Sequence, residues 1–183
     1  CKYGHHRSVR HDQVAEQIKI IFTALGKVAR TKGLQDVIPV PAGSPQLVPD
    51  VYCPDTQQVL DVSIIHPGAD SYRKRAAAKE GAAAVIREGT KDGKYLEPSK
   101  AVGLGFTPAV FESYGRCGLK FKKWFEEMVA DVEDMLPAGW PTTWSAHSFS
   151  AHFQQRVSVA LQRGNAQVIR QRSRRDHFRA PLM

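Results

Sequence analysis

The sequence predicts an α/β (α+β) fold in which a small mixed sheet with a β-hairpin is flanked by helices and followed by a C-terminal helical extension. Two β-rich runs, LVPDVYC (47–53) and QQVLDVSII (57–65), are separated by only three residues, which favours a hairpin. Segments with the apolar spacing of helices stand on both sides of these runs. The chain has 183 residues, of which 42% are hydrophobic, enough for one domain with a core or a domain with a helical appendage.

The predicted helices have apolar residues three and four positions apart, or many helix-forming residues. They are residues 10–33, 73–89, 119–136 and 145–172. Two further strands are predicted, VIPV (37–40) and AVGLGFTPAVFES (101–113), and Pro108 in the second indicates a sheet edge or a bulge. PAGWPTTW (137–144) is a predicted linker. One small mixed sheet flanked by helices would bury the apolar faces of these elements.

The charge of the chain favours acidic partners. The formal net charge is +8 and the pI is about 9.6, which indicates nucleic acid first and an anionic membrane surface second. An incidental basic tail is the alternative. The positive charge is densest near the C-terminus, where we predict contacts with nucleic-acid phosphates from Arg170, Arg172, Arg174, Arg175 and Arg179.

The sequence carries no sign of secretion or of a membrane span. No apolar stretch approaches the roughly 18 residues that cross a bilayer, and the polar, basic first residues are unlike a secretory signal. The cysteines Cys1, Cys53 and Cys117 are too few and too widely spaced for a disulfide framework. We therefore expect a nuclear or cytosolic protein.

The predicted hairpin contains two aspartates, one at its start and one within its second strand. Alternation along LDVSII places Asp61 and Ser63 on the face opposite Leu60 and Val62, and Asp50 opens the preceding strand. Across a hairpin the two carboxylates can approach each other, and a divalent cation would relieve their repulsion. Mg²⁺ favours such hard oxygen ligands and can activate a water for attack on a phosphate. The alternative is an ordinary turn aspartate and a solvent-facing one.

These residues carry a resemblance to a known family. PD, ten further residues and DVS resemble the PD-(D/E)XK nuclease signature. Together with RHDQVAEQI, DVSIIHP, GKY and VFESYG, the pattern is similar to the restriction-enzyme-like endonuclease at the C-terminal end of site-specific non-LTR retrotransposon (reverse transcriptase) polyproteins. The family fold is a helix, a three-stranded meander, a helix and a further strand.

The resemblance implies a Mg²⁺-dependent DNA endonuclease, with Mn²⁺ as an alternative ion, that nicks target DNA. Asp50 and Asp61 would hold the metal. The signature lysine is replaced by Ser63, and in the family a lysine from the following helical segment takes its role; Lys94 in GKY fits best, with Lys91 and Lys79 as alternatives.

The resemblance also divides the chain. Residues 1–9 would be the remnant of an upstream zinc knuckle, residues 10–117 the nuclease-like core, residues 118–144 a helix and linker, and residues 145–183 the basic extension. Cys1 resembles the last ligand of the knuckle. Because the other ligands would lie upstream, no zinc is expected in this fragment.

Two other functions fit the same residues. In the first, the domain is a catalytically inactive remnant, decayed or domesticated, that binds nucleic acid. In the second, it is a structural component of an RNA–protein assembly that uses its arginine tail. Cleavage that depends on a divalent metal would separate the endonuclease from the first, and preference for structured RNA over duplex DNA would indicate the second.

Overall fold

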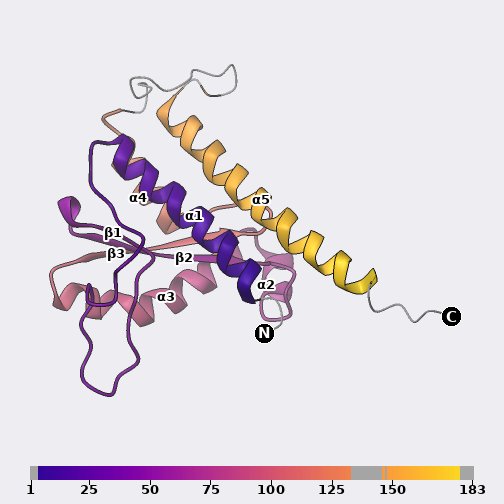
Figure 1. The fold of residues 1–183 in the computed structure, drawn as a ribbon, viewed down its shortest axis with the longest axis horizontal. Coiled ribbons are helices and arrows are strands. Elements are labelled where there is room, and N and C mark those ends of the chain that lie inside the picture. Colours follow the sequence, from indigo (N-terminus) through magenta and orange to yellow (C-terminus); the bar gives the residue numbers. More distant parts are fainter. Residues whose placement is uncertain (1–3, 133–145, 147, 178–183) are drawn as a thin grey trace.

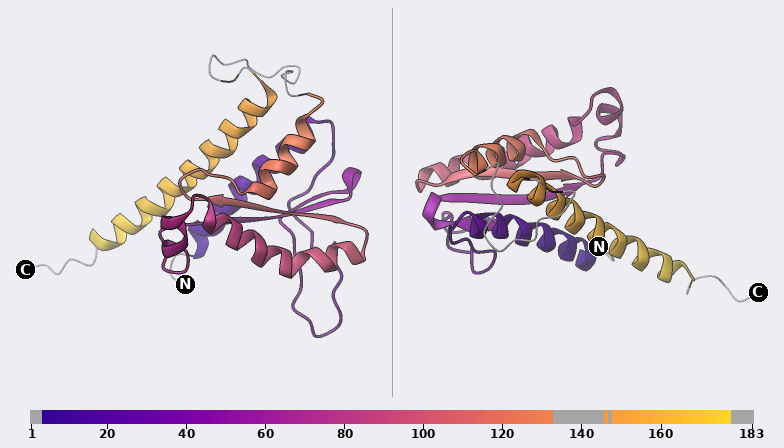
Figure 2. Two further views of the ribbon diagram at one scale, coloured as in Figure 1. Left: turned by 180° about the vertical axis from the view of Figure 1, so that it is seen from behind. Right: turned by 90° about the horizontal axis from the view of Figure 1, so that it is seen from above.

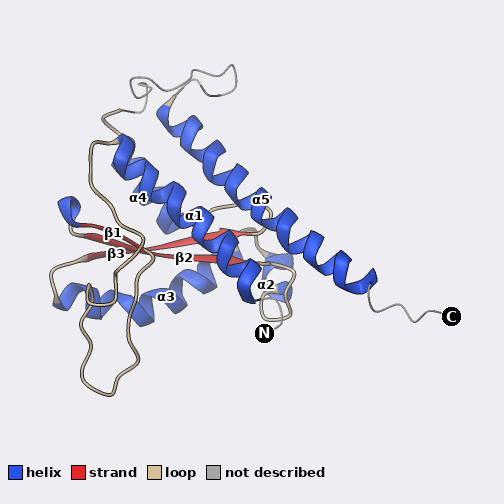
Figure 3. Ribbon diagram, in the orientation of Figure 1, coloured by secondary structure: helices blue, strands red, loops and turns tan. Residues whose placement is uncertain are grey.

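The computed structural model describes residues 4–132, 146 and 148–177, which form a mixed α+β fold with a small sheet, flanking helices and a long C-terminal helix (Figure 1, Figure 3). This coarse architecture confirms the prediction from sequence. The elements follow in the order α1 (Gly4–Ala24), β1 (Val51–Cys53), the 3₁₀ turn η1 (Pro54–Thr56), β2 (Gln58–Ile65), α2 (Arg73–Ala78), α3 (Ala82–Ala101), β3 (Gly105–Glu112), α4 (Leu119–Val129) and α5 (Phe149–His177).

The central strand of the three-stranded sheet is β2. β1 pairs with it antiparallel, with Val51 opposite Leu60, and η1 closes the predicted hairpin. Gln57 completes the turn in the left-handed region, at φ 51°. After α2 and α3 carry the chain across the sheet, β3 pairs with β2 in parallel. Within the described residues β3 is an edge strand, which is where Pro108 can stand without interrupting a ladder.

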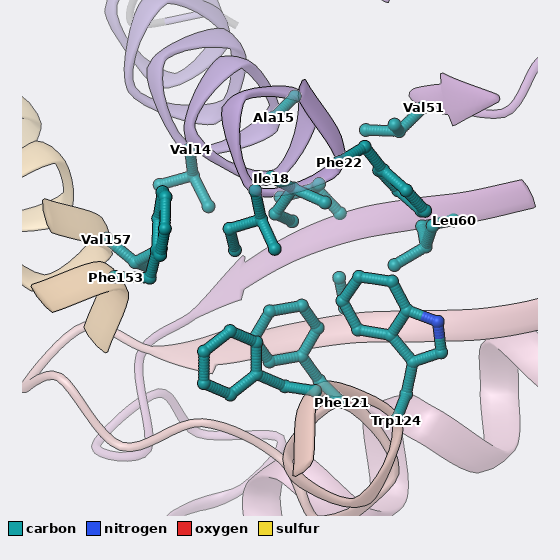
Figure 4. Close-up of a cluster of buried hydrophobic side chains, with 14 of the residues drawn as sticks. Val14, Ala15, Ile18, Phe22, Val51, Leu60, Phe121, Trp124, Phe153 and Val157 are labelled. Atoms are coloured by element: carbon teal, nitrogen blue, oxygen red, sulfur yellow. The ribbon is translucent and has the colours of Figure 1, made fainter. Parts of the chain in front are cut away.

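One face of the sheet is covered by α1, α4 and α5. Leu60 and Val62 of β2 point to this face and pack with apolar residues of all three helices. Figure 4 shows Ile18 of α1 and Trp124 of α4 converging on this cluster. The face follows from the alternation along β2, because every second side chain of a strand points the same way.

The other face is covered by α3, which lies across the strands from α4 and α5 (Figure 1). Val59 of β2 packs there with Tyr95 of α3, and Ile65 packs with Ala83 and Ala84 at the other end of the strand. Asp61 lies between Val59 and Ile65 in the same alternation. The predicted placement of Asp61 opposite Leu60 and Val62 is therefore confirmed.

The C-terminal helix α5 packs along α1, and Figure 2 shows the pair from two further sides. Arg156 of α5 donates from Nε to Gln17 Oε1 at 2.9 Å, and Arg10 of α1 donates from Nη1 to Asn165 Oδ1 at 2.7 Å. Gly164 permits this approach, because a Cβ there would overlap the Cβ and Cγ of Arg10. The packing brings the C-terminal extension onto the core.

Several predicted boundaries differ from the structure. The first helix spans 4–24 rather than 10–33, since the chain turns at Gly26 with φ +71°. The predicted helix 73–89 is divided into two: α2 ends at Ala78, before the extended Lys79, and α3 begins after Gly81, which takes a φ of +72°. The helix predicted at 119–136 is α4, which ends at Val129.

The β-rich segments before the hairpin also form less regular structure than predicted. VIPV contributes only the isolated bridge between Ile38 and Leu47, and the run 47–53 is a strand only from Val51. Prolines 39, 41, 45 and 49 remove backbone donors from this region, which limits ladder formation. The predicted linker 137–144 and the position of Cys1 lie outside the described residues.

Candidate acidic site on the sheet

The structure brings Asp50, the residue before β1, close to Asp61 of β2. The register pairs Val51 with Leu60, so the next residues along the two chains are Asp50 and Asp61, and the Asp50 N–H donates to Leu60 O at 2.9 Å. The charge of Asp50 also contributes to raising the pKa of Asp61, as expected for neighbouring carboxylates.

Asp61 is a buried carboxylate whose charge is compensated by one ammonium group. It is 3% exposed, and Lys91 Nζ of α3 lies 2.5 Å from its Oδ2. Burial, followed by the charge of Asp50, raises its pKa, while Lys91 and the hydroxyl of Tyr95 act in the opposite direction. Charged side chains are seldom buried without a partner, so Lys91 is what permits an ionised Asp61 in this position.

Asp50 is held from two sides. Its Oδ2 accepts a hydrogen bond from the backbone N–H of Val62 at 2.6 Å and lies 3.1 Å from Nε2 of His11 on α1. Because these contacts come from β2 and from α1, the position of Asp50 depends on the packing of the helix against the sheet.

His11 is surrounded by acceptors. Nε2 also lies 3.1 Å from Val62 O, and Nδ1 lies 3.1 Å from Asp12 Oδ1. Burial lowers the pKa of His11, but hydrogen bonds and charge interactions with Asp50 and Asp12 outweigh burial and raise it to about 9. An imidazolium can donate from both nitrogens, which satisfies this set of acceptors. His11 therefore carries a positive charge beside Asp50 at neutral pH.

Of the three candidate lysines, the structure places Lys91 on Asp61. Lys94, the first choice from sequence, is exposed; its ammonium lies 4.7 Å from the centroid of the Tyr95 ring and donates to the Tyr95 hydroxyl at 3.2 Å. Lys79 is exposed between α2 and α3. Lys91 is one helical turn before the buried Tyr95, and this spacing is a sequence signal that favours Lys91 over Lys94.

An open cleft of about 540 Å³ lies between α1 and α3, and it is lined by His11 and Lys91, the side chains that contact Asp50 and Asp61. Ser63, the residue at the signature lysine position, lines the cleft and accepts a hydrogen bond from Arg87 Nε at 3.2 Å. No motif or periodic pattern in the sequence places Arg87 or His11 at this site. Both come to the site from helices that are distant in sequence from the strand residue they contact.

The donor set fits one kind of metal ion better than others. The described residues contain no cluster of three or more histidine, cysteine, aspartate or glutamate side chains that could hold a metal. Mg²⁺ needs no such cluster, since it keeps several waters and is commonly bound by one or two carboxylates together with substrate phosphates. Asp50 and Asp61 fit Mg²⁺ or Mn²⁺ in that manner, and they do not make the closed four-ligand site of structural zinc.

The basic extension is described in part. Helix α5 includes the positions of Arg170, Arg172, Arg174 and Arg175, and Arg170 is exposed, whereas Arg179 lies outside the described residues. Every helix in the described part of the chain is too short or too polar to span a bilayer. Nucleic-acid contacts from the arginines remain a prediction.

No protein-family model and no curated protein sequence matches this chain.

Proposed function

We propose that this chain is a Mg²⁺-dependent DNA endonuclease domain of the PD-(D/E)XK type, from a retrotransposon-derived protein. The observation that carries the proposal is the proximity of Asp50 and Asp61 at the start of the hairpin, with Lys91 on Asp61. The order of elements supports it with one departure. The meander of the family fold is represented here by the hairpin and the isolated bridge between Ile38 and Leu47.

A Mg²⁺ or Mn²⁺ ion held by Asp50 and Asp61 would supply a Lewis acid for the phosphate and an activated water. The protein positions the two carboxylates: His11 and the Val62 N–H hold Asp50, and Lys91 holds Asp61. In hydrolysis the water oxygen bonds to phosphorus, the bond from phosphorus to one ester oxygen breaks, and that oxygen receives a proton. The products are a phosphate monoester end and a hydroxyl end.

Lys91 replaces Lys94 in this proposal as the assisting lysine. Its ammonium is already beside the metal-binding carboxylate, where a fixed positive charge can offset the charge that develops on the phosphate. Lys94 would have to leave the Tyr95 ring to act there. The position of Lys91 also compensates for Ser63, whose hydroxyl cannot supply a charge.

The decisive experiment is nicking of supercoiled plasmid by the purified chain with Mg²⁺ and with EDTA. We expect cleavage only with the divalent ion and none from Asp61→Asn, which keeps the shape of the side chain and removes its charge. Asp70→Asn is the matched control, because Asp70 is an exposed carboxylate in a surface pair with Arg73. Metal-independent cleavage, or full activity of Asp61→Asn, would reject the proposed site.

The choice of lysine is tested in the same assay. Lys91→Ala should slow cleavage by roughly 10²-fold or more, as for loss of one preorganised charge. Lys94→Ala and Lys79→Ala should remain within a few-fold of the wild type. Loss of activity in Lys94→Ala alone would restore the choice made from sequence.

A second candidate is binding to nucleic acid without cleavage, and Ser63 in the signature lysine position favours it. The chain would then bind duplex DNA equally well in EDTA and with Mg²⁺, and leave the plasmid intact. Tighter binding to structured RNA than to duplex DNA would indicate a role in an RNA–protein assembly. A DNA substrate implies a nuclear location.

A further inference from the structure

Arg87 is a cation of the cleft with no carboxylate partner in the described structure. It lies one helical turn before Lys91 on α3, is half-buried, and makes one hydrogen bond, from Nε to Ser63 Oγ. A guanidinium has five N–H donors. The single bond to Ser63 therefore leaves both terminal nitrogens of Arg87 available to a ligand.

The other cationic groups that line the cleft have partners. Lys91 pairs with Asp61, His11 contacts Asp12 as well as the hairpin, and Arg10 donates to Asn165 on α5. Arg87 thus differs from its neighbours in having positive charge that the described protein does not compensate. Arg87 is therefore the lining cation best placed to pair with an anion in the cleft.

The position of Arg87 relates it to the signature lysine. Ser63 stands where the PD-(D/E)XK signature has lysine, and its hydroxyl, acting as acceptor, fixes the guanidinium at that point. Arg87 of α3 therefore places a positive charge at the position where the signature has a lysine on the strand. Arg87 and Lys91 are four residues apart, so they project from the same face of the helix.

We infer that Arg87, anchored by Ser63, forms a subsite for a backbone phosphate of a nucleic-acid strand next to Asp61. The inference rests on the proposed function for the identity of the strand. Guanidinium groups bind phosphate oxygens through two parallel hydrogen bonds, which gives direction as well as attraction. The cleft, at about 540 Å³, is within the usual range of ligand sites and has room for a nucleotide.

The subsite has a separate role from Lys91. Lys91 is engaged with the carboxylate that is proposed to hold the ion, whereas Arg87 lines the cleft and makes its one hydrogen bond, within the described residues, from Nε. Arg87 would therefore contribute to binding of the strand before any metal is present. This difference allows the subsite to be measured without catalysis.

The test is binding of a short fluorescein-labelled DNA duplex to the full chain in EDTA, followed by fluorescence anisotropy. Arg87→Gln should weaken binding by roughly 10-fold, as for loss of a charge-assisted hydrogen-bonding group. Arg87→Lys should recover part of this affinity, and Ser63→Ala should weaken binding by a few-fold because the anchor is removed. Arg73→Gln is the control for a general decrease in charge, since Arg73 lies on the exposed surface of α2.

A second measurement reports on Arg87 without a variant. In the wild-type chain, the NMR signal of the Arg87 Nε–H group should shift when the duplex is added and should saturate with the binding curve. A signal that does not move, or an Arg87→Gln variant that binds as well as Arg73→Gln, would overturn the inference. Inorganic phosphate is the third probe; if it produces the same shift and displaces the duplex at micromolar concentration, the assignment to a nucleic-acid strand is wrong.

The two proposals fail separately. If the wild type does not nick plasmid but Arg87→Gln loses binding, the endonuclease proposal falls and the subsite remains. If the wild type nicks plasmid and Arg87→Gln binds and cleaves normally, the subsite falls and the endonuclease proposal remains.

Discussion

Lys91→Met removes the ammonium group that faces Asp61 and keeps most of the side-chain volume. The side chains of Lys91 and Asp61 are 13% and 5% exposed, so the substitution leaves a carboxylate in the interior with its main compensating charge removed. Removing one partner of a buried pair typically costs about 3–5 kcal/mol. We expect the variant to be less stable than the wild type, in EDTA, by an amount that depends on pH.

The pH dependence follows from the raised pKa of Asp61, which results first from burial and then from Asp50. A carboxyl group whose pKa is higher in the folded than in the unfolded state favours folding at low pH and costs stability as pH rises through the raised value. The folded protein can remove that cost by binding a proton at the carboxyl group. The cost therefore has a ceiling, which is the free energy of protonating the carboxyl group at the given pH. The ceiling grows by about 1.4 kcal/mol for each pH unit above the usual pKa of about 3.9.

The ceiling is about 4 kcal/mol near pH 7 and about 1.5 kcal/mol near pH 5. We therefore expect Lys91→Met to lower the free energy of unfolding by about 3 kcal/mol near pH 7 and about 1 kcal/mol near pH 5. Urea unfolding followed by circular dichroism at both pH values measures the two changes. Adding Asp61→Asn to Lys91→Met should recover most of the stability near pH 7.

Lys94→Met is the control, since Lys94 is exposed and should change stability by less than about 1 kcal/mol through its interaction with Tyr95. An equal decrease for Lys91→Met at both pH values would show that packing, and not the charge of Asp61, is responsible. No decrease at either pH would refute the description of the pair as buried and mutually dependent.

Three further outcomes are expected. Gly118→Ala should destabilise the fold by about 1–3 kcal/mol, because a Cβ there would displace the buried Glu88 carboxylate from the Lys120 N–H. Gly93→Ala has open space around its Cβ position and should stabilise α3 by about 0.5–1 kcal/mol. Urea unfolding measures both changes. Added Mg²⁺ should raise the thermal unfolding midpoint of the wild type and leave that of Asp61→Asn unchanged, since an ion stabilises only a state that binds it. Deleting residues 170–183 should weaken DNA binding and flatten its salt dependence by about 0.9 in slope for each phosphate that the arginines neutralise in the full chain, and an unchanged slope would show that the arginines do not touch DNA.

The carboxylates and the cations of the candidate site differ in how well they could be predicted from the sequence. The proximity of the carboxylates could be predicted because Asp50 and Asp61 are brought together by one hairpin, which forms between neighbouring segments of the chain. The cations were not, because His11 and Arg87 are 39 and 24 residues from the partners they contact, Asp50 and Ser63. Lys91 was among the alternatives, and choosing it required knowing which side of α3 packs against β2.

The break at Gly81 shows why that side was hard to predict. A helix predicted to run continuously over 73–89 implies one rotation for all its residues, whereas the observed α3 starts again at Ala82 and extends to Ala101. The rotation of α3 about its axis is then set by the burial of Ala84 and Tyr95 against the sheet. That rotation turns Lys91 toward Asp61 and leaves Lys94 exposed.

The sequence by itself determined the hairpin, the face of β2 from which Asp61 projects and the helical character of the C-terminal extension. These follow from turn residues and from the periods of strands and helices, which act over a few residues. Only the tertiary structure decided which side chains meet there: Lys91 on Asp61, His11 on Asp50 and Arg87 on Ser63. The physical reason is that each of these interactions depends on how a helix is rotated and translated against the sheet, and many apolar side chains far apart in sequence set that placement together.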